Sequence, residues 1–518
     1  MQAPSIGFAS TSPTNRESLL ESRRRSVPSG STLRTSSCST SRPSVAARCR
    51  SSSKVKPRLV VLRRCLRRRG TACRFRRCSM KDDEVQVKGP VTRFIAPVAH
   101  VEGHIAVPGD KSVSHRALLI GALADGETHV SGFGRSGDTE STMNAVRALG
   151  ATVDELDVDT LVVHGVGVRG LRAPDRPIDC GNAGTLARLV TGLLAFQDGA
   201  FELTGDDSLS RRPMERVAGP LREMGAQIET IDGHLPMRIT GGALTGLQYE
   251  MPVASAQVKS AILLAGLGAA EPVTVIEPAP TRDHTELMLG AAGAKVRVRG
   301  LSVTVEAPER LRLPEVHVPG DISSAAPYLV AAALLPGSKL MVHDIGLNPR
   351  RTGLLDVLER MGVRVGIHNR RKIAGELIGD VEVEAQPLVA TTIEPHEVPL
   401  LVDELPIFGL LAACARGKSV VKGAEELRHK ESNRIETAVA ALQAIGVRAR
   451  ETEDGFTVTG VPTRPRGGRI HARGDHRIAM LGAVAGIVSK DGVRVEDAEC
   501  VSISFPGFYS LLESVSVQ

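Results

Sequence analysis

The residues with the clearest capacity for chemistry lie in one ten-residue stretch, 107–116 (VPGDKSVSHR). A Pro-Gly pair ends a strand-like run, and Asp110 and Ser112 are residue types that cap a helix N-terminus. Lys111 therefore falls in a first helical turn, where unpaired backbone N–H groups and the positive end of the helix dipole attract anions. With Arg116 one turn further on, the stretch is suited to a phosphate or a carboxylate. An ordinary capped helix with a solvated Lys and Arg fits these residues equally well.

Other loops share this character, with Gly or Pro beside cationic or amide side chains. Their glycines allow a backbone to approach a ligand closely, and Thr185 in the first of them is expected to start a helix that carries Arg188. Each loop alone is typical of a solvated surface. Together they predict a cleft between two domains, in which Arg and Lys from both sides hold a doubly anionic substrate. The loops are 179–188 (DCGNAGTLAR), 205–213 (GDDSLSRRP), 255–259 (SAQVK), 426–434 (ELRHKESNR) and 474–477 (GDHR).

Two carboxylates are candidates for acid–base chemistry. Asp403 has apolar neighbours (LLVDELPIF), so desolvation is expected to raise its pKa toward a useful range. Glu431 lies within RHKESNR. A helix N-cap for Asp403 and a surface salt bridge for Glu431 are the equally weighted alternatives. The sequence contains neither a GxSxG elbow nor an HExxH motif, so serine-hydrolase and metallohydrolase chemistry have no support.

Two stretches resemble nucleotide-binding loops but lack a feature that such a loop requires. GVGVRG at 165–170 is followed by Pro174 and Pro177 where a helix must begin, and ARGKS at 415–419 has Ala412 at its first glycine position. ATP and NAD are therefore not expected as ligands.

Composition narrows the class of protein. A chain of 518 residues is too long for one core, so two or more domains are expected. Aromatic residues make up only 3% and Trp is absent, which disfavours a stacking platform for single-stranded nucleic acid. No run of 18 apolar residues exists, so no membrane span is predicted.

Charge and cysteine separate a leader from a body. Residues 1–80 hold 17 Arg and 2 Lys against 2 Glu, a balance of +17, whereas the rest of the chain has a balance of −10. We expect residues 1–90, rich in Ser and Arg, to be disordered. They fit a transit peptide, a nucleic-acid-binding arm, or sequence upstream of a true start at Met80. Three of the eight cysteines lie in the body, which suits a reducing compartment. The expected location is the cytoplasm, or a plastid if the leader is a transit peptide.

The body is built from repeats. VPGD at 107–110 recurs at 318–321, each time followed by a small-residue helix, a strand and a second helix. These second helices end in a Gly and run into a strand, and the same ending occurs five times, at Gly150, Gly225, Gly293, Gly362 and Gly446. The spacing predicts six units of one strand–helix–strand type, three in each half, with SFPGFYSLLESV closing the sixth.

Taken together, these motifs closely resemble the 5-enolpyruvylshikimate-3-phosphate synthase family over residues 95–515. The resemblance implies an α/β (α+β) enolpyruvyl transferase fold of two domains, each with three βαβαββ repeats in an inverted α/β barrel. Residues 91–109 and 321–518 would form one domain and residues 110–320 the other, with the active site in the cleft between them. It also implies transfer of the enolpyruvyl group of phosphoenolpyruvate to the 5-hydroxyl of shikimate 3-phosphate, without cofactor or metal.

The resemblance also assigns residues to roles. Asp403 would accept the proton of the 5-hydroxyl, and Glu431 and Lys111 would handle protons at the enolpyruvyl carbons. The ligands implied for shikimate 3-phosphate are Lys111, Ser112, Arg116, Ser255, Gln257, Asp403 and Lys430. Those implied for phosphoenolpyruvate are Lys111, Gly184, Arg212, Gln257, Arg434 and Arg477. The partners expected are these two small molecules, with no nucleic acid and no membrane, and the chain is expected to be a monomer.

Some positions depart from the commonest bacterial pattern and are similar to the family's second sequence class. Ala256 stands where a second Ser is usual, Glu426 where Asn is usual, and Ile503 where a Lys is frequent. TRDHTE at 281–286 replaces a Tyr-containing loop, and Arg282 could supply the missing positive charge. Gly184 is the glycine that glyphosate-tolerant forms replace with Ala, so the resemblance predicts inhibition by glyphosate.

Two rival functions remain open from the sequence. The first is the related transferase that acts on UDP-N-acetylglucosamine, but its catalytic Cys is missing from GDDSLSRRP, and Cys180 is expected to be a small buried residue. The second is a nucleic-acid-binding protein that uses the basic leader. Deleting residues 1–80 distinguishes that binder from an enzyme.

Overall fold

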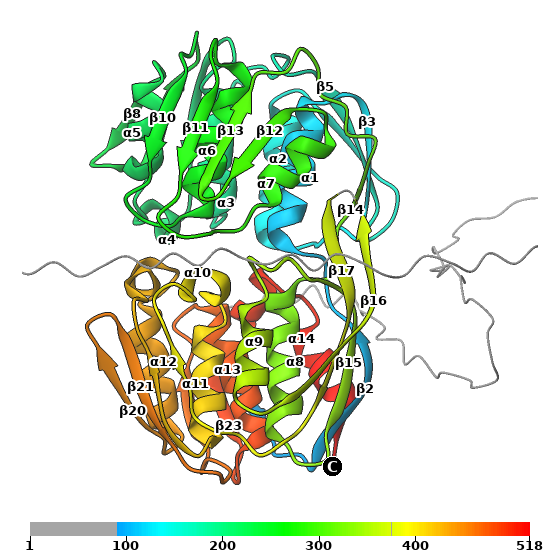
Figure 1. The fold of residues 1–518 in the computed structure, drawn as a ribbon, viewed down its shortest axis with the longest axis vertical. Helices are drawn as coiled ribbons and strands as arrows, with labels where there is room; N and C mark the ends of the chain where they lie inside the picture. The colour runs from blue at the N-terminus through cyan, green and yellow to red at the C-terminus, as the bar shows by residue number, and fades with distance from the viewer. Residues whose placement is uncertain (1–90, 374) are drawn as a thin grey trace, which may run out of the picture. The chain divides into compact units, whose positions relative to one another are not determined.

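The computed structural model describes residues 91–373 and 375–518, which belong to one compact unit. The leader, 1–90, and its predicted disorder lie outside the described residues. The buried apolar side chains form two separate cores, one from residues 113–318 and the other from residues 98–105 and 322–515. We call the parts around these cores the upper lobe and the lower lobe, as they stand in Figure 1.

The upper lobe contains three four-stranded sheets, with strand orders β14-β3-β5-β4, β6-β7-β9-β8 and β10-β11-β13-β12. Its elements in chain order are α1 (Lys111–Leu123), β3 (Asp125–Ser131), α2 (Gly137–Ala148), β4 (Thr152–Glu155), β5 (Leu161–Val166), β6 (Ile178–Asp179), α3 (Gly184–Leu194), β7 (Ala200–Thr204), α4 (Asp207–Ser210), α5 (Glu215–Glu223), β8 (Gln227–Ile231), β9 (His234–Thr240), β10 (Leu247–Glu250), α6 (Ala256–Ala265), the 3-10 helix η1 (Gly266–Gly268), β11 (Val273–Ile276), α7 (His284–Ala291), β12 (Lys295–Arg299), β13 (Ser302–Glu306) and β14 (Glu315–His317).

The lower lobe also contains three sheets, with strand orders β16-β17-β15-β2-β24, β18-β19-β21-β20 and β1-β23-β22. Its elements are β1 (Arg93–Ile95), β2 (His100–Ala106), α8 (Ile322–Leu334), β15 (Lys339–Gly346), α9 (Gly353–Arg360), β16 (Arg364–Ile373), β17 (Glu376–Glu384), β18 (Thr392–Ile393), α10 (Val398–Leu401), α11 (Leu405–Cys414), β19 (Gly417–Val421), η2 (Glu425–His429), α12 (Arg434–Ala444), β20 (Arg448–Thr452), β21 (Gly455–Gly460), β22 (Gly468–His471), α13 (His476–Val488), β23 (Val493–Glu496), η3 (Ala498–Ile503), α14 (Phe508–Val515) and β24 (Ser516–Val517).

One supersecondary unit recurs in the upper lobe, and β18-α11-β19-α12-β20-β21 repeats it in the lower lobe. In β6-α3-β7-α5-β8-β9 and again in β10-α6-β11-α7-β12-β13, two parallel strands are joined through a helix and are followed by a second helix and a hairpin. The first helix of each unit is buried along nearly its whole length, as α3 and α6 show, which is expected of largely apolar helices. The helices therefore fill the lobe and the sheets cover it.

The five predicted helix ends are confirmed. The glycine that follows α2, α5, α7, α9 or α12 has a φ between +87° and +102° in every case, which is the left-handed conformation that ends a helix at low cost only with Gly. These glycines are Gly150, Gly225, Gly293, Gly362 and Gly446.

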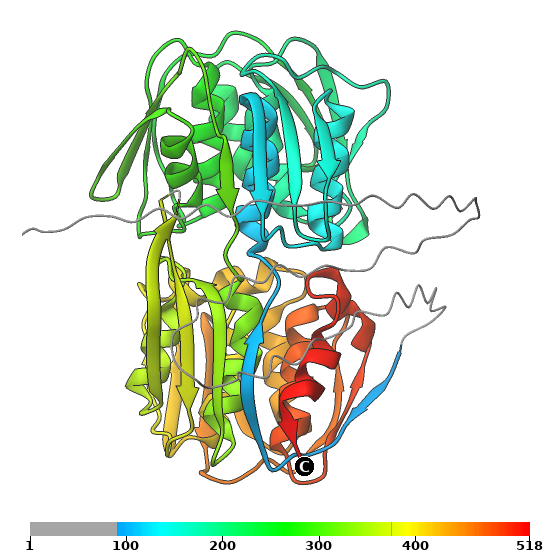
Figure 2. The same ribbon diagram turned by 90° about the vertical axis from the view of Figure 1, so that its right-hand side faces the viewer.

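The two VPGD segments lie side by side where the chain passes between the lobes (Figure 2). Gly109 and Gly320 form an antiparallel bridge, and Asp110 N donates to Pro319 O at 2.7 Å. β2 pairs with β15, which follows α8, whereas β14 pairs with β3, which follows α1. Each sheet is thus completed by a strand whose own next helix belongs to the other lobe. A Cβ on Gly109 would lie 1.9 Å from Gly132 O, so this close crossing requires glycine.

Candidate active site

Six helices present their first turns to one cavity of about 670 Å³. Upper-lobe helices α1, α3 and α6 contribute the lining residues Lys111, Gly184 and Ala256, each the first residue of its helix. Lower-lobe helices α8, α12 and α13 contribute Asp321, Arg434 and His476, which are an N-cap and two first residues. Because each helix start carries a partial positive charge and unpaired N–H groups, the cavity favours anions before any side chain is considered.

Most of the site residues predicted from the sequence line this cavity. The residues found there are Lys111, Ser112, Gly184, Arg212, Ser255, Gln257, Asp403, Lys430, Glu431, Arg434 and Arg477. Asp110 caps α1 as predicted by accepting from Val113 N at 2.9 Å, and Ser255 caps α6. Helix α3 begins at Gly184, one residue before the predicted Thr185, and carries Arg188 into the cavity.

Arg116 is the predicted ligand that the structure does not place in the cavity. It is 2% exposed, and its Nε and Nη2 donate to Thr285 Oγ1 at 2.6 Å and Ser260 Oγ at 2.8 Å. Its Nη1 donates to Ser112 O at 2.9 Å. The guanidinium thus supports the first turn of α1 from behind, and its role as a ligand of shikimate 3-phosphate stays a prediction.

Lys111 is held in its charged form. Its Nζ lies 2.7 Å from Oδ2 of Asp138, which is buried near the start of α2. Burial alone would lower the pKa of Lys111, but the fields of Asp138 and Glu431 raise it above its ordinary value. Lys111 is therefore a cation at the mouth of α1, with a proton to give.

A group of guanidinium and amide side chains surrounds Gly184. Arg212 Nη2 donates to Asn182 Oδ1 at 2.7 Å, and Arg188 Nη1 donates to Gln257 Oε1 at 2.9 Å. A Cβ on Gly184 would lie 2.7 Å from Arg188 Nη1 and 3.3 Å from Arg212 Nη1. The glycine therefore leaves room for both guanidinium groups.

The predicted rise in the pKa of Asp403 is wrong. Burial does raise it, but Arg282, Lys430 and Arg434 act in the opposite direction and together hold the pKa of Asp403 well below its usual range. Arg282 Nη2 donates to Asp403 Oδ2 at 2.5 Å and Arg434 Nη1 donates to Asp403 Oδ1 at 3.2 Å. Asp403 is not an N-cap either, because Glu404 occupies the N-cap position of α11. Asp403 is thus an ionised carboxylate whose partners come from both lobes.

Glu431 is a second ionised carboxylate and not a surface ion pair. Burial raises the pKa of Glu431, but Arg434, Arg212 and other cations lower it well below its ordinary value. Its oxygens lie 2.6 Å from Arg434 Nη2 and 3.7 Å from Arg212 Nη1. Arg434 is fixed in turn by Asp475, the N-cap of α13, through a 2.9 Å bond from its Nε.

Asp138, Arg216 and Arg351 are among the charged lining residues that were not predicted from the sequence. Arg351 is buried and lies 3.1 Å from Asp321 Oδ1, 3.7 Å from Asp110 Oδ2 and 3.6 Å from Asp403 Oδ2. It thereby joins the caps of the two VPGD helices to the site carboxylate. Its motif, NPRRTG, places a basic pair directly after a Pro, whereas GDDSLSRRP has a basic pair directly before one, so a basic pair next to a Pro is the sequence signal that the two share.

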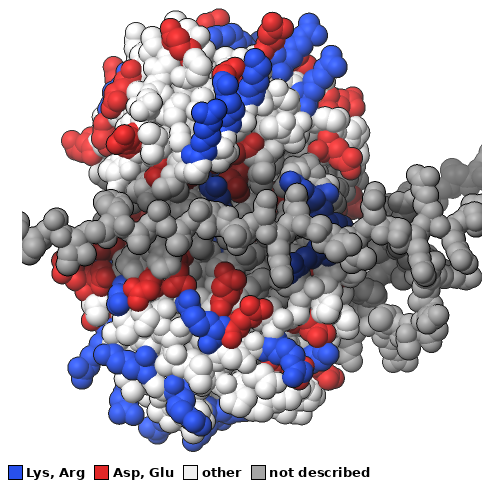
Figure 3. Space-filling model, viewed as in Figure 1, with Lys and Arg blue, Asp and Glu red and all other residues white. Residues whose placement is uncertain are grey.

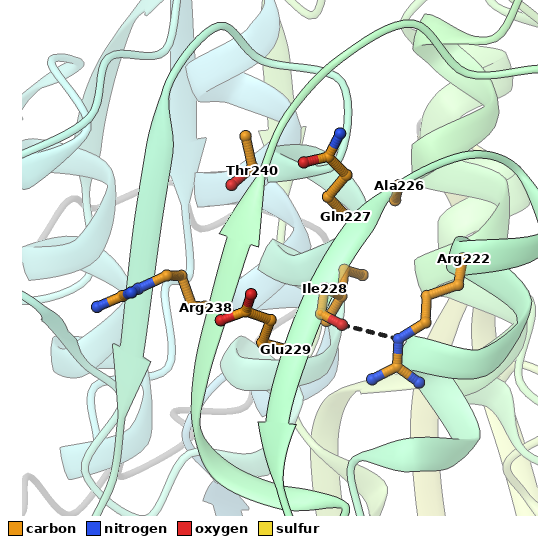
Figure 4. Close-up of a pocket in the computed structure, with 7 residues that line it drawn as sticks. All are labelled: Arg222, Ala226, Gln227, Ile228, Glu229, Arg238 and Thr240. Atoms are coloured by element: carbon orange, nitrogen blue, oxygen red, sulfur yellow. Dashed lines mark hydrogen bonds between the residues drawn. The ribbon is translucent and has the colours of Figure 1, made fainter.

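A second hollow lies away from this cleft, on the outer side of the β8–β9 hairpin (Figure 4). It measures about 310 Å³ and shares no lining residue with the cavity described above. Arg222 Nε donates to Ile228 O at its edge, at 2.8 Å. Glu229 and Arg238 also line the hollow, but it lacks the convergent helix starts of the cleft.

Comparison with known proteins decides the family. The sequence family described as EPSP synthase (3-phosphoshikimate 1-carboxyvinyltransferase) matches residues 95–512. The chain belongs to this family. A 3-phosphoshikimate 1-carboxyvinyltransferase from Alkalilimnicola ehrlichii is 48% identical over 425 residues, which are 82% of this chain and 95% of that protein. The enzyme of the same name from Geobacillus kaustophilus is 47% identical over 421 residues, 81% of this chain and 98% of its own.

Solved structures agree with this family. EPSP synthase from Acinetobacter baumannii superposes with a TM-score of 0.75 at 41% identity, covering 82% of this chain and 98% of that one. The enolpyruvyl transferase NikO from Streptomyces tendae, 18% identical with a TM-score of 0.68, shares the fold. These matches confirm the resemblance, the enolpyruvyl transferase fold and the enzyme class predicted from the sequence, and they give no support to the two rivals. None of the described helices has the length and apolar character needed to cross a membrane.

Proposed function

We propose that this EPSP synthase family member transfers the enolpyruvyl group of phosphoenolpyruvate to the 5-hydroxyl of shikimate 3-phosphate and releases phosphate. The observation that carries the proposal is the cavity itself, in which six helix starts and cations from both lobes surround two ionised carboxylates. Both substrates are anions that carry a phosphate and a carboxylate, so this charge distribution suits the pair.

The two substrates divide the cavity. Shikimate 3-phosphate takes Lys111, Ser112, Ser255, Gln257, Asp403 and Lys430, with Arg116 holding Ser112 in place. Phosphoenolpyruvate takes Lys111, Gly184, Arg212, Gln257, Arg434 and Arg477. Arg477 is oriented for this by a bond of 2.7 Å from its Nη1 to Ser323 O, and Arg212 by its bond to Asn182. Arg282, which lines the cavity beside Asp403, adds a cation next to the shikimate ring.

The position of Asp403 in the cavity, with its two oxygens held by partners from both lobes, supports the role of a base. Because it is ionised at neutral pH, it is ready to accept the proton of the 5-hydroxyl as that oxygen attacks C2 of phosphoenolpyruvate. The bonds from Arg282 and Arg434 orient its two oxygens. A tetrahedral adduct forms when C3 is protonated, and loss of phosphate from C2 with a proton from C3 restores the double bond.

Proton transfer at C3 is divided between Lys111 and Glu431, which both line the cavity. Their pKa shifts keep Lys111 protonated and Glu431 ionised before the reaction begins, so Lys111 is the group that carries a proton and Glu431 the group that lacks one. Arg212 and Arg434 remain positively charged beside the phosphate as negative charge develops on it.

The decisive test is phosphate release by the purified chain with both substrates together and with each alone. Release that needs both substrates supports the proposal, and release from phosphoenolpyruvate alone contradicts it. The variant Asp403→Asn should lower kcat by about 10²–10⁴-fold, the range contributed by one general base. Asp491→Asn, at an exposed carboxylate outside the cavity, is the matched control and should turn over normally.

We also place this activity in the cytoplasm, in a monomer. Cys180, Cys414 and Cys500 are free thiols among the described residues, which suits a reducing compartment, and Cys180 is fully buried as expected of a small apolar residue. Size-exclusion chromatography with light scattering tests the oligomeric state.

A further inference from the structure

An ion pair between Arg216 and Glu426 spans the cleft without taking part in the proposed chemistry. Arg216 lies on α5 in the upper lobe and Glu426 on η2 in the lower lobe. Nη1 of Arg216 donates to both carboxylate oxygens of Glu426, at 3.1 Å and 3.2 Å. Their side chains are 27% and 29% exposed, and both residues line the cavity. The pair therefore stands at the cleft's edge, where neither side chain is fully solvated.

The pair lies on the side of the cleft away from the chain crossing. In Figure 1, α5 and α12, which directly follows η2 in the lower lobe, lie toward the left, whereas β2 and β14, which lead into the crossing, lie toward the right. Among the described residues, backbone hydrogen bonds join the lobes near the bridge between Gly109 and Gly320. Side-chain pairs such as Arg282–Asp403 and His284–Glu376 also join them. If the lobes separate by rotation about the crossing, the opposite edge moves furthest. A contact at that edge therefore resists the separation most strongly.

The charge of Glu426 favours the arrangement of the structure, in which the two lobes are in contact across the cleft. Arg216 belongs to a group of three upper-lobe cations, with Arg188 and Arg212, and burial together with the fields of Arg216 and Arg212 lowers the pKa of Arg188 to about 9. Glu426 acts in the opposite direction on Arg188. The mutual repulsion of these cations is thus partly offset by a carboxylate that only the other lobe provides.

We propose that Arg216 and Glu426 form an interlobe latch, which favours closed lobes and so holds Arg188 and Arg212 at the distance that the substrates need. Both are positioning residues, since they act through other side chains. The affinity for shikimate 3-phosphate is informative only if the proposed function is right. The test therefore also includes a measurement of the radius of gyration, which needs no substrate.

The experiment is a charge-swap cycle on the full chain. Arg216→Glu and Glu426→Arg should each weaken binding of shikimate 3-phosphate, measured by titration calorimetry, by about two- to fivefold, which is the coupling typical of a partly exposed pair. The double variant, with the charges exchanged, should recover most of the wild-type affinity. Saturating kcat should stay within about twofold, because closure is restored when both substrates are bound. High salt should reduce the difference between wild type and single variants.

A control variant and a measurement without substrate separate the latch from a general effect of charge reversal. Arg222→Glu, on the same helix, disturbs a pair with Glu215 inside the upper lobe and should leave the affinity unchanged. Small-angle X-ray scattering should give a larger radius of gyration for each single variant than for the double variant. If the change in binding free energy of the double variant equals the sum of the changes in the two single variants, the latch is overturned, even when the wild-type enzyme has normal catalytic activity. If the wild type binds no shikimate 3-phosphate, the proposed function fails, and the scattering series alone supports or overturns the latch.

Discussion

At the scale of the residue, Lys430 should set the alkaline limit of activity. Burial lowers its pKa below the ordinary value for lysine, although Asp403 and Glu426 act in the opposite direction. Since a lowered lysine pKa means that the charge is lost sooner as pH rises, kcat/KM for shikimate 3-phosphate should fall on the alkaline side as pH passes through it. Lys430→Arg, which stays charged, should move this limb to higher pH.

The control for this profile is Lys418→Arg on β19, at an exposed position outside the cavity. Its profile should coincide with that of the wild type. An alkaline limb that is the same in the Lys430 variant and the wild type would assign the limb to another group.

Gly184 should govern sensitivity to glyphosate. The wild type should be inhibited at millimolar concentrations, as the family resemblance predicts. In Gly184→Ala the new methyl group meets Arg188 Nη1 at 2.7 Å, a distance that forces the guanidinium to move, and it crowds Arg212. The KM for phosphoenolpyruvate should therefore rise by a few-fold, about 1 kcal/mol of lost binding, and the inhibition constant for glyphosate should rise more. Initial rates at varied inhibitor measure both, and an unchanged inhibition constant would contradict this role.

Residues with a local signature could be predicted, and residues defined by distant partners could not. Lys111 directly follows the N-cap of α1, and Ser255 is itself the N-cap of α6. The residues next to them in the sequence therefore indicate that they lie at the start of a helix. Asp138, by contrast, is defined by a lysine 27 positions earlier in the chain. The pKa of Asp403 was misjudged for the same reason: its apolar neighbours are visible in the sequence, whereas Arg282 is 121 positions away.

At the scale of the element, helix α6 is anchored by a buried charge cluster that should dominate the stability of its unit. Lys259 Nζ lies 2.9 Å from Glu277 Oε1 and 2.7 Å from Glu286 Oε1, and all three side chains are at most 4% exposed. Lys259→Met leaves the buried Glu286 without this cation and leaves Glu277 with Arg350 at 3.4 Å, so it should lower the free energy of unfolding by about 3–5 kcal/mol. Urea denaturation measures this loss.

The comparison for this prediction is Lys295→Met on β12, whose pair with Glu306 has a lysine side chain that is 80% exposed. It should cost at most about 1 kcal/mol. An equal decrease in the free energy of unfolding in the two variants would show that the buried Lys259 cluster stabilises the protein no more than an exposed ion pair does.

The repeated elements could be predicted because each is terminated locally. A glycine with positive φ closes the second helix of five units, and the endings are visible in the sequence as a small periodic signal. The exchange of β2 and β14 between the lobes has no such signal. Pairing of strands so far apart in the chain depends on packing of the two lobes, so the crossing followed from the family resemblance and not from periodicity.

At the scale of the whole molecule, charge is divided between the leader and the enzyme body. The body has a balance of −10, and on the face in Figure 3 both signs of charge appear on each lobe. A group of cations also lines the cleft, where Lys111, Arg212, Lys430 and Arg434 face one cavity. We therefore expect the body to select small anions over a polyanion, because a nucleic-acid duplex would meet the mixed outer surface and not the buried guanidinium groups.

Catalysis should therefore be separable from the basic leader. A chain that begins at Met80 retains every residue that lines the described cavity and the whole matched range 95–512, so its kcat and KM values should stay within about twofold of the full chain, a change below 0.5 kcal/mol. Any retention on immobilised DNA or RNA should disappear with the +17 segment and should weaken steeply with salt in the full chain. Phosphate release and retention are measured on the same two preparations. Loss of turnover on truncation would mean that the leader contributes to the site, whereas turnover kept and retention lost would separate an enzyme from the arm attached to it.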